Sequence, residues 1–298
     1  MSVSIEALRD GFAGEVSGID CTQPLSAAEV AAVSVGMDAY GVLVFHDQVL
    51  TDAEQLAFTL YFGAIEKTGY GMPRIHFRTE QEARPLGSGI NDFSNVDADG
   101  TPIARESRAY MFKLADRLWH SDSSFKAVPA KWSLLSGRSI PSWGGNTGFA
   151  DMRGAYDALD ERWRNEVEDL VCLHSQIYSR EKVGFSNLSE AEREAFKPVR
   201  QLLVRRHPVT GRKSLFLSSH AGAVEGMSIA DGRMLLHDLT EFATKDRFVY
   251  SHKWRLNDFV LWDNSVTMHR GTRFDPSEPR DIRQTRLAGD AMTIEQAA

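Results

Sequence analysis

The chain has 298 residues, of which 42% are hydrophobic and 25% charged, as in a globular protein that buries a core without disulfides or metal staples. The net charge is -7, and Lys and Arg do not cluster in any stretch, which argues against nucleic acid as a partner. No apolar run approaches the ~20 residues of a membrane span, so a membrane partner is not expected either.

The predicted elements mix short strands with helices along the whole chain. A helix is expected after Thr51, because Thr51 can cap it and Glu54 completes a capping box. Helical spacing of apolar residues predicts two more helices, over residues 152–170 and 228–243. Short apolar runs bounded by turn-forming residues predict strands. These runs cover residues 41–45, 132–135, 147–150, 201–204, 214–217, 248–250 and 259–262.

Short strands with a minority of helices predict a mainly β fold of the α+β class, a sandwich or jelly roll with covering helices. Two segments, residues 67–90 and 179–198, fit neither a strand nor a helix pattern. Long irregular segments are usually functional lids or disorder, and both interpretations stay open here. As a lid, residues 67–90 would suit an aromatic or terpenoid-sized substrate, because the segment contains aromatic and apolar side chains.

The pattern His120-x-Asp122 is the first candidate for chemistry. Residues i and i+2 of a strand share one face, so an extended backbone would let both side chains share one metal ion. His269 follows an apolar strand and a turn-like Asp263-Asn264, at a distance compatible with two strands meeting in a sandwich. Two histidines and one carboxylate form the protein half of a non-haem iron site, which leaves positions open for a cosubstrate and O2.

These residues resemble the taurine/2,4-dichlorophenoxyacetate family of Fe(II)- and 2-oxoglutarate-dependent dioxygenases, and most closely its branch that cleaves phenoxyacetate herbicides. The resemblance spans nearly the whole chain. It includes residues 41–45, Ser94-Asn95-Val96, residues 118–125, Gly144-Gly145-Asn146-Thr147, Trp262-Asp263-Asn264 and His269-Arg270.

The family implies a double-stranded β-helix (jelly-roll, cupin-like) core in one dioxygenase domain over residues 1–298. It also implies that His120, Asp122 and His269 bind Fe(II). By the same resemblance, Arg280 would pair with the distal carboxylate of 2-oxoglutarate and Thr147 would hydrogen-bond it. A planar, permanently charged guanidinium suits that role.

The resemblance implies oxidative decarboxylation of 2-oxoglutarate with O2, giving succinate and CO2, coupled to hydroxylation of a small organic substrate. If the hydroxylated carbon carries an ether oxygen, as in an aryloxyalkanoate, the ether is cleaved. Two alternatives stay open. The same chemistry would suit a sulfonate, a sulfate ester or a neutral hydrophobic biosynthetic intermediate, and a non-catalytic cupin-like binding protein would keep only the fold.

The chain departs from the family at Gln284, where a second arginine often binds the anionic group of the substrate. Gln donates hydrogen bonds but carries no charge. Arg283 would face away from the strand face that carries Gln284, whereas Arg286 would share it. The substrate is therefore neutral, or an anion held by another cation such as Arg74, Arg78 or Arg286. The candidate substrate-binding residues are His76, Ser94, Asn95, Gln284 and Arg286.

The two cysteines, Cys21 and Cys172, fit neither a metal motif nor a disulfide framework. Reduced thiols suit a cytoplasmic protein, and the N-terminal residues lack the pattern of a signal peptide. The relatives in this family assemble into dimers or larger oligomers, so a homo-oligomer is a further expectation, although the chain holds no diagnostic element for it.

Overall fold

The computed structural model describes residues 3–67, 84 and 86–296. Helices α1 and α2 precede the site, α3 and η1 lead into it, and α4–α8 follow. Their bounds are α1 Ala27–Tyr40, α2 Asp52–Leu60, α3 Arg108–Lys113, η1 Leu114–Arg117, α4 Met152–Asp157, α5 Glu161–Val167, α6 Gln176–Lys182, α7 Glu190–Ala195, α8 Ile229–Ala243, η2 Asp246–Phe248 and η3 Thr293–Glu295.

The strands form one large sheet and three small ones. The seven-stranded sheet has the order β1-β2-β3-β13-β5-β15-β4, and the others are β12-β6-β14, β11-β7-β8 and β10-β9. The strand bounds are β1 Ser4–Arg9, β2 Ala13–Ser17, β3 Val42–Phe45, β4 Asn91–Asp92, β5 Trp132–Ser139, β6 Thr147–Asp151, β7 Val171–His174, β8 Val199–Leu202, β9 Val204–Arg206, β10 Lys213–Leu215, β11 Ala221–Val224, β12 Val249–His252, β13 Phe259–Asp263, β14 Thr267–Gly271 and β15 Asp281–Arg286.

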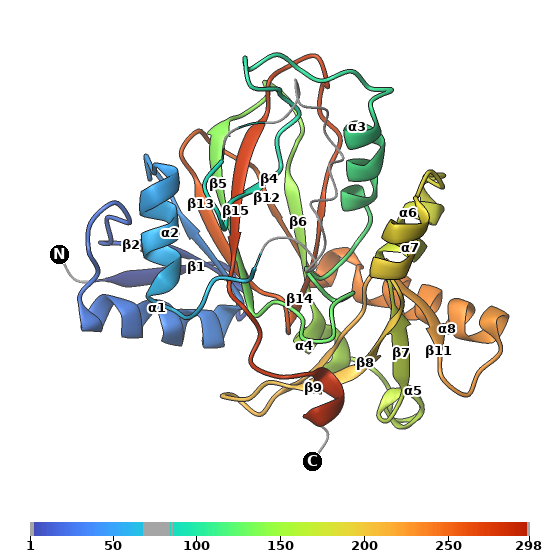
Figure 1. Ribbon diagram of the computed structural model, residues 1–298. Helices are drawn as coiled ribbons and strands as arrows, with labels where there is room; N and C mark the ends of the chain where they lie inside the picture. The colour runs from blue at the N-terminus through green and yellow to red at the C-terminus, as the bar shows by residue number, and fades with distance from the viewer. Residues whose placement is uncertain (1–2, 68–83, 85, 297–298) are drawn as a thin grey trace.

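The central strands of the large sheet are apolar on both faces because each face packs against another layer. On β13, Phe259 and Leu261 pack with residues of α1 and α2. Val260 and Trp262 point the other way, toward Phe149 of the β12-β6-β14 sheet. In Figure 1, α1 and α2 lie on one side of the large sheet and α6, α7 and α8 on the opposite side of the molecule. The two facing sheets therefore enclose the central core.

The helix predicted after Thr51 is confirmed as α2. The Thr51 hydroxyl accepts from the Glu54 amide and the Glu54 carboxylate accepts from the Thr51 amide, which is the capping box that the sequence indicated. The helix predicted over residues 228–243 is α8, and Ser228 caps it. The predicted strands at residues 41–45, 132–135, 147–150, 214–217, 248–250 and 259–262 coincide with β3, β5, β6, β10, β12 and β13 within a few residues.

Two predictions need correction. Residues 152–170 form two helices, because Asp160 caps a new helix by accepting from the Trp163 amide. The run 201–204 is divided between β8 and β9, since Leu203 leaves the β7–β8 ladder: its amide donates to Leu170 and its carbonyl accepts from Phe216. The Asp160 cap is local in sequence, whereas the hydrogen-bond partners of Leu203 lie far along the chain. In both places these bonds interrupt an element that the apolar pattern would have continued.

Half of the unassigned segment 179–198 is helical, as the end of α6 and the whole of α7. Phe185 and Phe196 are buried in it, and both rings pack near Phe112 of α3. Most of the other predicted lid, residues 67–90, lies outside the described residues, as do His76, Arg74 and Arg78. Over the described residues, none of the helices has the length and apolar content needed to cross a bilayer.

Candidate metal centre and adjoining cavity

His120 and His269 face each other across an isolated antiparallel bridge. The His120 amide donates to the His269 carbonyl at 2.9 Å, and the His269 amide donates to the His120 carbonyl at 2.8 Å. The sequence predicted an extended backbone from His120 to Asp122, but the strand does not continue to Asp122. A turn begins there, with Ser123 at a positive φ of 55°. Asp122 reaches the histidines from the start of this turn rather than from a strand face.

The three predicted ligands come together. Oδ1 of Asp122 lies 3.9 Å from Nε2 of His120 and 3.9 Å from Nε2 of His269. One possible ligand atom from each of the three residues lies within 4.8 Å of the others, and all three side chains are buried. Within the described residues no other set of three such residues brings one ligand atom from each within 4.8 Å of the other two.

The surroundings of both imidazoles leave a ring nitrogen with a lone pair that can bind a metal ion. Nδ1 of His120 donates to the Leu118 carbonyl at 2.8 Å, because a carbonyl only accepts, and Nε2 then carries the lone pair that faces the cluster. Burial, followed by the neighbouring His120, lowers the pKa of His269 to about 3. His269 is therefore neutral at pH 7 and can donate a lone pair to a cation.

Asp122 presents one oxygen to the cluster and anchors the other. Its Oδ2 accepts from the Ser133 hydroxyl at 2.6 Å and from Nε2 of Gln284 at 2.9 Å. Burial alone would raise the pKa of Asp122, but His269, Arg286 and the Ser133 hydrogen bond outweigh burial and lower it. Since Oδ2 is occupied by donors, Oδ1 is the oxygen left for a metal ion. The donor set of two imidazole nitrogens and one carboxylate oxygen fits Fe(II).

A cavity of about 870 Å³, its open mouth included, adjoins this cluster. Its lining includes both histidines and five of the other predicted site residues. These five are Ser94, Asn95, Thr147, Arg280 and Gln284.

Arg280 and Thr147 are the cavity residues best suited to a dicarboxylate. Among the described residues, the side-chain hydrogen bonds of Arg280 are long, 3.5 Å to the Phe93 carbonyl and 3.3 Å to the Gly145 carbonyl, and no carboxylate pairs with it. The Thr147 hydroxyl accepts from Nε1 of Trp254 at 3.0 Å, so its own hydrogen remains to donate to a ligand. A guanidinium without a carboxylate partner and a hydroxyl with a free hydrogen together match one carboxylate group.

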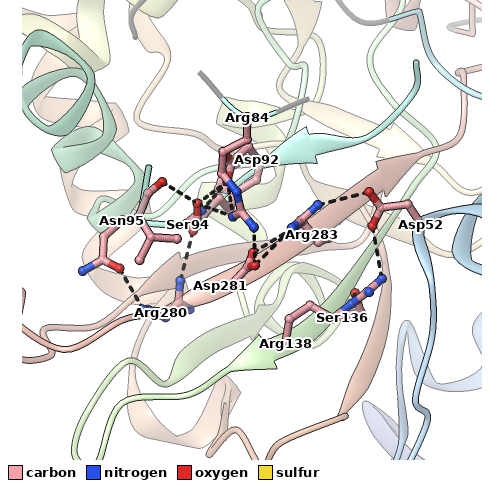
Figure 2. A network of polar contacts seen from close by, with 12 residues as sticks. Asp52, Arg84, Asp92, Ser94, Asn95, Ser136, Arg138, Arg280, Asp281 and Arg283 are labelled. Carbon is pink, nitrogen blue, oxygen red and sulfur yellow. Dashed lines mark hydrogen bonds and ion pairs between the residues drawn. The ribbon is translucent and has the colours of Figure 1, made fainter. Parts of the chain in front are cut away.

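Ser94 and Asn95 line the cavity but are tied to its wall. Oδ1 of Asn95 accepts from the Arg280 amide at 2.8 Å, and its Nδ2 donates to carbonyls of the β14–β15 connection. The Ser94 hydroxyl accepts from Arg84 at 3.0 Å. Figure 2 shows that Arg84 also pairs with Asp281, which connects it to a larger network of ion pairs. Asn95 therefore fixes the backbone of Arg280, and its amide is already saturated.

The structure places Arg286 beside the metal centre and outside the cavity lining. Its Nε lies 3.0 Å from a Glu66 carboxylate oxygen, and one terminal nitrogen lies 3.9 Å from Oδ1 of Asp122. Arg283 faces the other way, as predicted, and pairs with Asp281. Gln284 is both a cavity residue and a hydrogen-bond donor to Asp122.

The sequence did not indicate four residues around the site: Ser133 and Asn264 support Asp122, Trp254 holds Thr147, and Arg117 lines the cavity. Asn264 was named only as part of a turn and of a family motif, with no role of its own, although its Oδ1 accepts from the Asp122 amide at 3.2 Å. Ser133 and Trp254 carry no motif, and the fold alone brings them to the site.

Two facing β-sheets with a buried His-Asp-His cluster beside a cavity define a mononuclear non-haem oxygenase. Comparison with known proteins agrees. The model of the family "Taurine catabolism dioxygenase TauD, TfdA family" matches residues 4–286. The chain belongs to this family of dioxygenases.

Individual relatives resemble the chain over most of its length. The alpha-ketoglutarate-dependent 2,4-dichlorophenoxyacetate dioxygenase of Cupriavidus pinatubonensis is 41% identical, with 98% of this chain and 100% of that protein covered. The (S)-phenoxypropionate/alpha-ketoglutarate-dioxygenase of Sphingobium herbicidovorans is 38% identical, with 84% and 83% covered. A crystal structure of AAD-2 in complex with Mn(II) and N-oxalylglycine matches with a TM-score of 0.93 and 52% identity, covering 98% of this chain and 100% of AAD-2. The predicted family, jelly-roll fold and dioxygenase class are confirmed.

Proposed function

We propose that this dioxygenase uses Fe(II), 2-oxoglutarate and O2 to hydroxylate an aryloxyalkanoate at the carbon next to its ether oxygen. The observation that carries the proposal is the buried cluster of His120, Asp122 and His269 opening on a cavity that also presents Arg280 and Thr147. Relatives at 41% and 38% identity are named for 2,4-dichlorophenoxyacetate and phenoxypropionate, and for alpha-ketoglutarate.

Three side-chain atoms would hold the metal: Nε2 of His120, Nε2 of His269 and Oδ1 of Asp122. When bound, Fe(II) would activate O2 so that one oxygen atom enters succinate, formed with CO2 from 2-oxoglutarate, and the other enters the substrate. Ser133 and Gln284 keep Asp122 oriented by holding Oδ2. Arg280 binds the distal carboxylate of 2-oxoglutarate and Thr147 donates a hydrogen bond to it.

The substrate binds against the wall formed by α3 and η1. Tyr110 and Leu114 line the cavity there, and Ile103, which precedes α3, lines it as well. All three offer apolar surface to an aryl ring. Hydroxylation of the carbon beside the ether oxygen gives a hemiacetal, which collapses to a phenol and a carbonyl compound. The protein's part is to hold that carbon near the metal and to limit the access of water.

The remaining expectations belong to this proposal as well. One domain would span residues 1–298, with lids at 67–90 and 179–198. The enzyme would act in the cytoplasm on a small molecule, without nucleic acid or membrane partners. Self-association stays a prediction, which a sedimentation experiment can decide.

The test is a spectroscopic and product assay on the purified protein. Anaerobic addition of Fe(II) and 2-oxoglutarate should give the visible metal-to-ligand charge-transfer band of this family, and 2,4-dichlorophenoxyacetate under air should give one succinate and one phenol per turnover. A band with no phenol from any aryloxyalkanoate would refute the substrate class alone. Absence of the band would refute the iron and 2-oxoglutarate chemistry as well.

A further inference from the structure

The cations of β15 beyond Arg280 are all engaged away from the cavity. Arg283 lies 2.8 Å from Asp281 and 3.1 Å from Asp52. Arg286 lies 3.0 Å from Glu66. Gln284 does line the cavity, but it is neutral and its amide donates to Asp122. An anionic substrate group therefore finds no free positive charge on this strand.

Another cation faces the cavity from the opposite wall. Arg117 is the last residue of η1 and lines the cavity together with Lys113. The Lys113 ammonium donates to the carbonyls of Asp92 at 2.7 Å and Ser94 at 3.0 Å. Within the part of the chain that the structure describes, Arg117 makes no hydrogen bond, ion pair or ring contact. An arginine lining a cavity without any partner is a ready site for a carboxylate.

The neighbouring acid does not neutralise Arg117. Asp116 also lines the cavity, but its Oδ1 lies 3.3 Å from a terminal nitrogen of Arg180 on α6. The nearly buried Arg180 guanidinium, 4.0 Å above the Phe112 ring, thus competes for the only acidic side chain adjacent to Arg117 in sequence. The positive charge of Arg117 is left to the cavity.

Arg117 and Arg280 form a pair of like charges across the same cavity. Burial, followed by the charge of Arg117, lowers the pKa of Arg280 to about 10, so Arg280 is still charged at pH 7. Two facing cations with no carboxylate between them repel each other, and two bound anions relieve that repulsion. The distal carboxylate of 2-oxoglutarate accounts for one anion and leaves one to be assigned.

We propose that Arg117 binds the carboxylate of the organic substrate, supplying from η1 the charge that Gln284 lacks on β15. This inference rests on the proposed function, since it assumes an anionic substrate in this cavity. The aryl ring would lie along Tyr110 and Leu114, which line the same wall. Arg117 precedes His120 by three residues, so the short segment Leu118–Trp119 links the carboxylate anchor to a metal ligand.

A second cavity offers a competing role for this arginine. Arg117 also borders a groove lined by Lys182, Arg233 and Arg270. If the Arg117 guanidinium binds a ligand in that groove instead, substitution of Arg117 would leave substrate binding in the first cavity unchanged. Arg233 lines only the second groove, where its Nε donates to the Gly222 carbonyl at 3.2 Å. It is therefore the matched control for loss of one positive charge.

The experiment is titration calorimetry of 2,4-dichlorophenoxyacetate, and of its uncharged methyl ester, into protein loaded with Mn(II) and N-oxalylglycine. Wild type should bind the acid at least about tenfold more tightly than the ester. R117Q should weaken binding of the acid about 10- to 100-fold, the range of one charge-assisted contact, and leave the ester within about twofold. R117K should recover part of the loss, and R233Q should match wild type.

Three outcomes overturn the inference in distinguishable ways. Binding of the acid by R117Q as tightly as by wild type would remove Arg117 from the site and leave the proposed function standing. Equal weakening of acid and ester would show a structural role only. If wild type binds neither compound and releases no succinate with them, the proposed function and this inference fail together. Should R117Q not fold, R117S and the acid-to-ester ratio of wild type decide the matter.

Discussion

The described part of the chain contains two clusters of one aspartate and two histidines, and they differ in how closely their members approach. Around Asp258, Nδ1 of His46 lies 2.5 Å from one carboxylate oxygen and Nε2 of His252 lies 2.9 Å from the other. Around Asp122, both histidines stand 3.9 Å from the same oxygen. The first is a closed set of hydrogen bonds, and the second leaves space between three lone-pair donors.

The supporting contacts explain the difference. The oxygens of Asp258 are each taken by a histidine, and the Arg255 amide donates to one of them at 2.7 Å. In the Asp122 cluster, Ser133 and Gln284 hold only Oδ2, so the histidines are not needed as donors to the carboxylate. The same three residue types therefore form a structural cluster in one place and a candidate metal centre in the other, according to which other groups satisfy the carboxylate.

Separate substitution of Asp122 and of Asp258 should distinguish the metal-binding cluster from the structural cluster most strongly. Asp122→Ala should lose metal binding and lower kcat/KM by well over the about 100-fold that loss of a supporting contact costs. The reason is that a coordinating oxygen disappears. Calorimetric titration of Mn(II) and the succinate assay measure both quantities, and circular dichroism checks the fold. Normal turnover in this variant would remove Asp122 from the ligand set.

Asp258→Ala should lower stability and leave metal binding unchanged, the reverse of Asp122→Ala. It leaves His46, His252 and the Arg255 amide without their acceptor in a buried place, which should lower the free energy of unfolding by about 3–5 kcal/mol. Urea unfolding measures that change. Asp258→Asn keeps one carbonyl acceptor and should lose less. Titration with Mn(II) should give wild-type affinity in both variants, and a loss of affinity at either would contradict the structural role of this cluster.

The supporting contacts of Asp122 give a smaller effect. Gln284→Ala removes one of the two donors to Oδ2 and should weaken Mn(II) binding about 10- to 100-fold. Gln48 is a matched control beside the other cluster, where its Nε2 donates to the His46 carbonyl at 2.9 Å. Gln48→Ala should leave metal affinity unchanged. Equal affinity in Gln284→Ala and wild type would show that the Ser133 hydroxyl holds Oδ2 alone.

The sequence predicted that His120, Asp122 and His269 lie together, because their spacing and the resemblance both reside in short motifs. It could not predict what Gln284 contacts. Its contact depends on the pairing of β15 with β5, which sets Gln284 opposite Leu135 and Arg286 opposite Ser133. The second cluster left no trace in the sequence either, because His46 and Asp258 are 212 residues apart and meet only where β3 pairs with β13.

The sequence-based prediction was also wrong about the backbone at Asp122, and it did not identify Arg117, in both cases because of local structure. Asp122 was expected on an extended strand, but the turn at Ser123 begins there. The alternation argument brought His120 and Asp122 together through an incorrect backbone conformation. Arg117 gave no signal because a charged residue is unremarkable until its neighbours are known. Only the packing of α6 shows that Arg180 takes the acid beside it.

A third carboxylate, Asp281, extends the comparison to partners with a permanent charge and gives the smallest expected effect. Figure 2 shows Asp281 between Arg84 and Arg283, at 2.6 Å and 2.8 Å, with Arg283 continuing to Asp52. Burial alone would raise the pKa of Asp281, but hydrogen bonds from Arg84 and Arg283 outweigh burial and lower it to about 2.

Because the folded pKa lies below the unfolded value of about 4, the stability that Asp281 contributes is present above pH 4. It is lost as the pH falls from about 4 to about 2. At pH 7 Asp281→Asn should lower the free energy of unfolding by at most about 2 kcal/mol, and the gap to wild type should narrow toward pH 2. Urea midpoints from pH 7 to pH 2.5 measure it, with the exposed Asp290→Asn as control. A gap that stays constant over this range would mean that the arginines hold Asp281 by geometry rather than by charge.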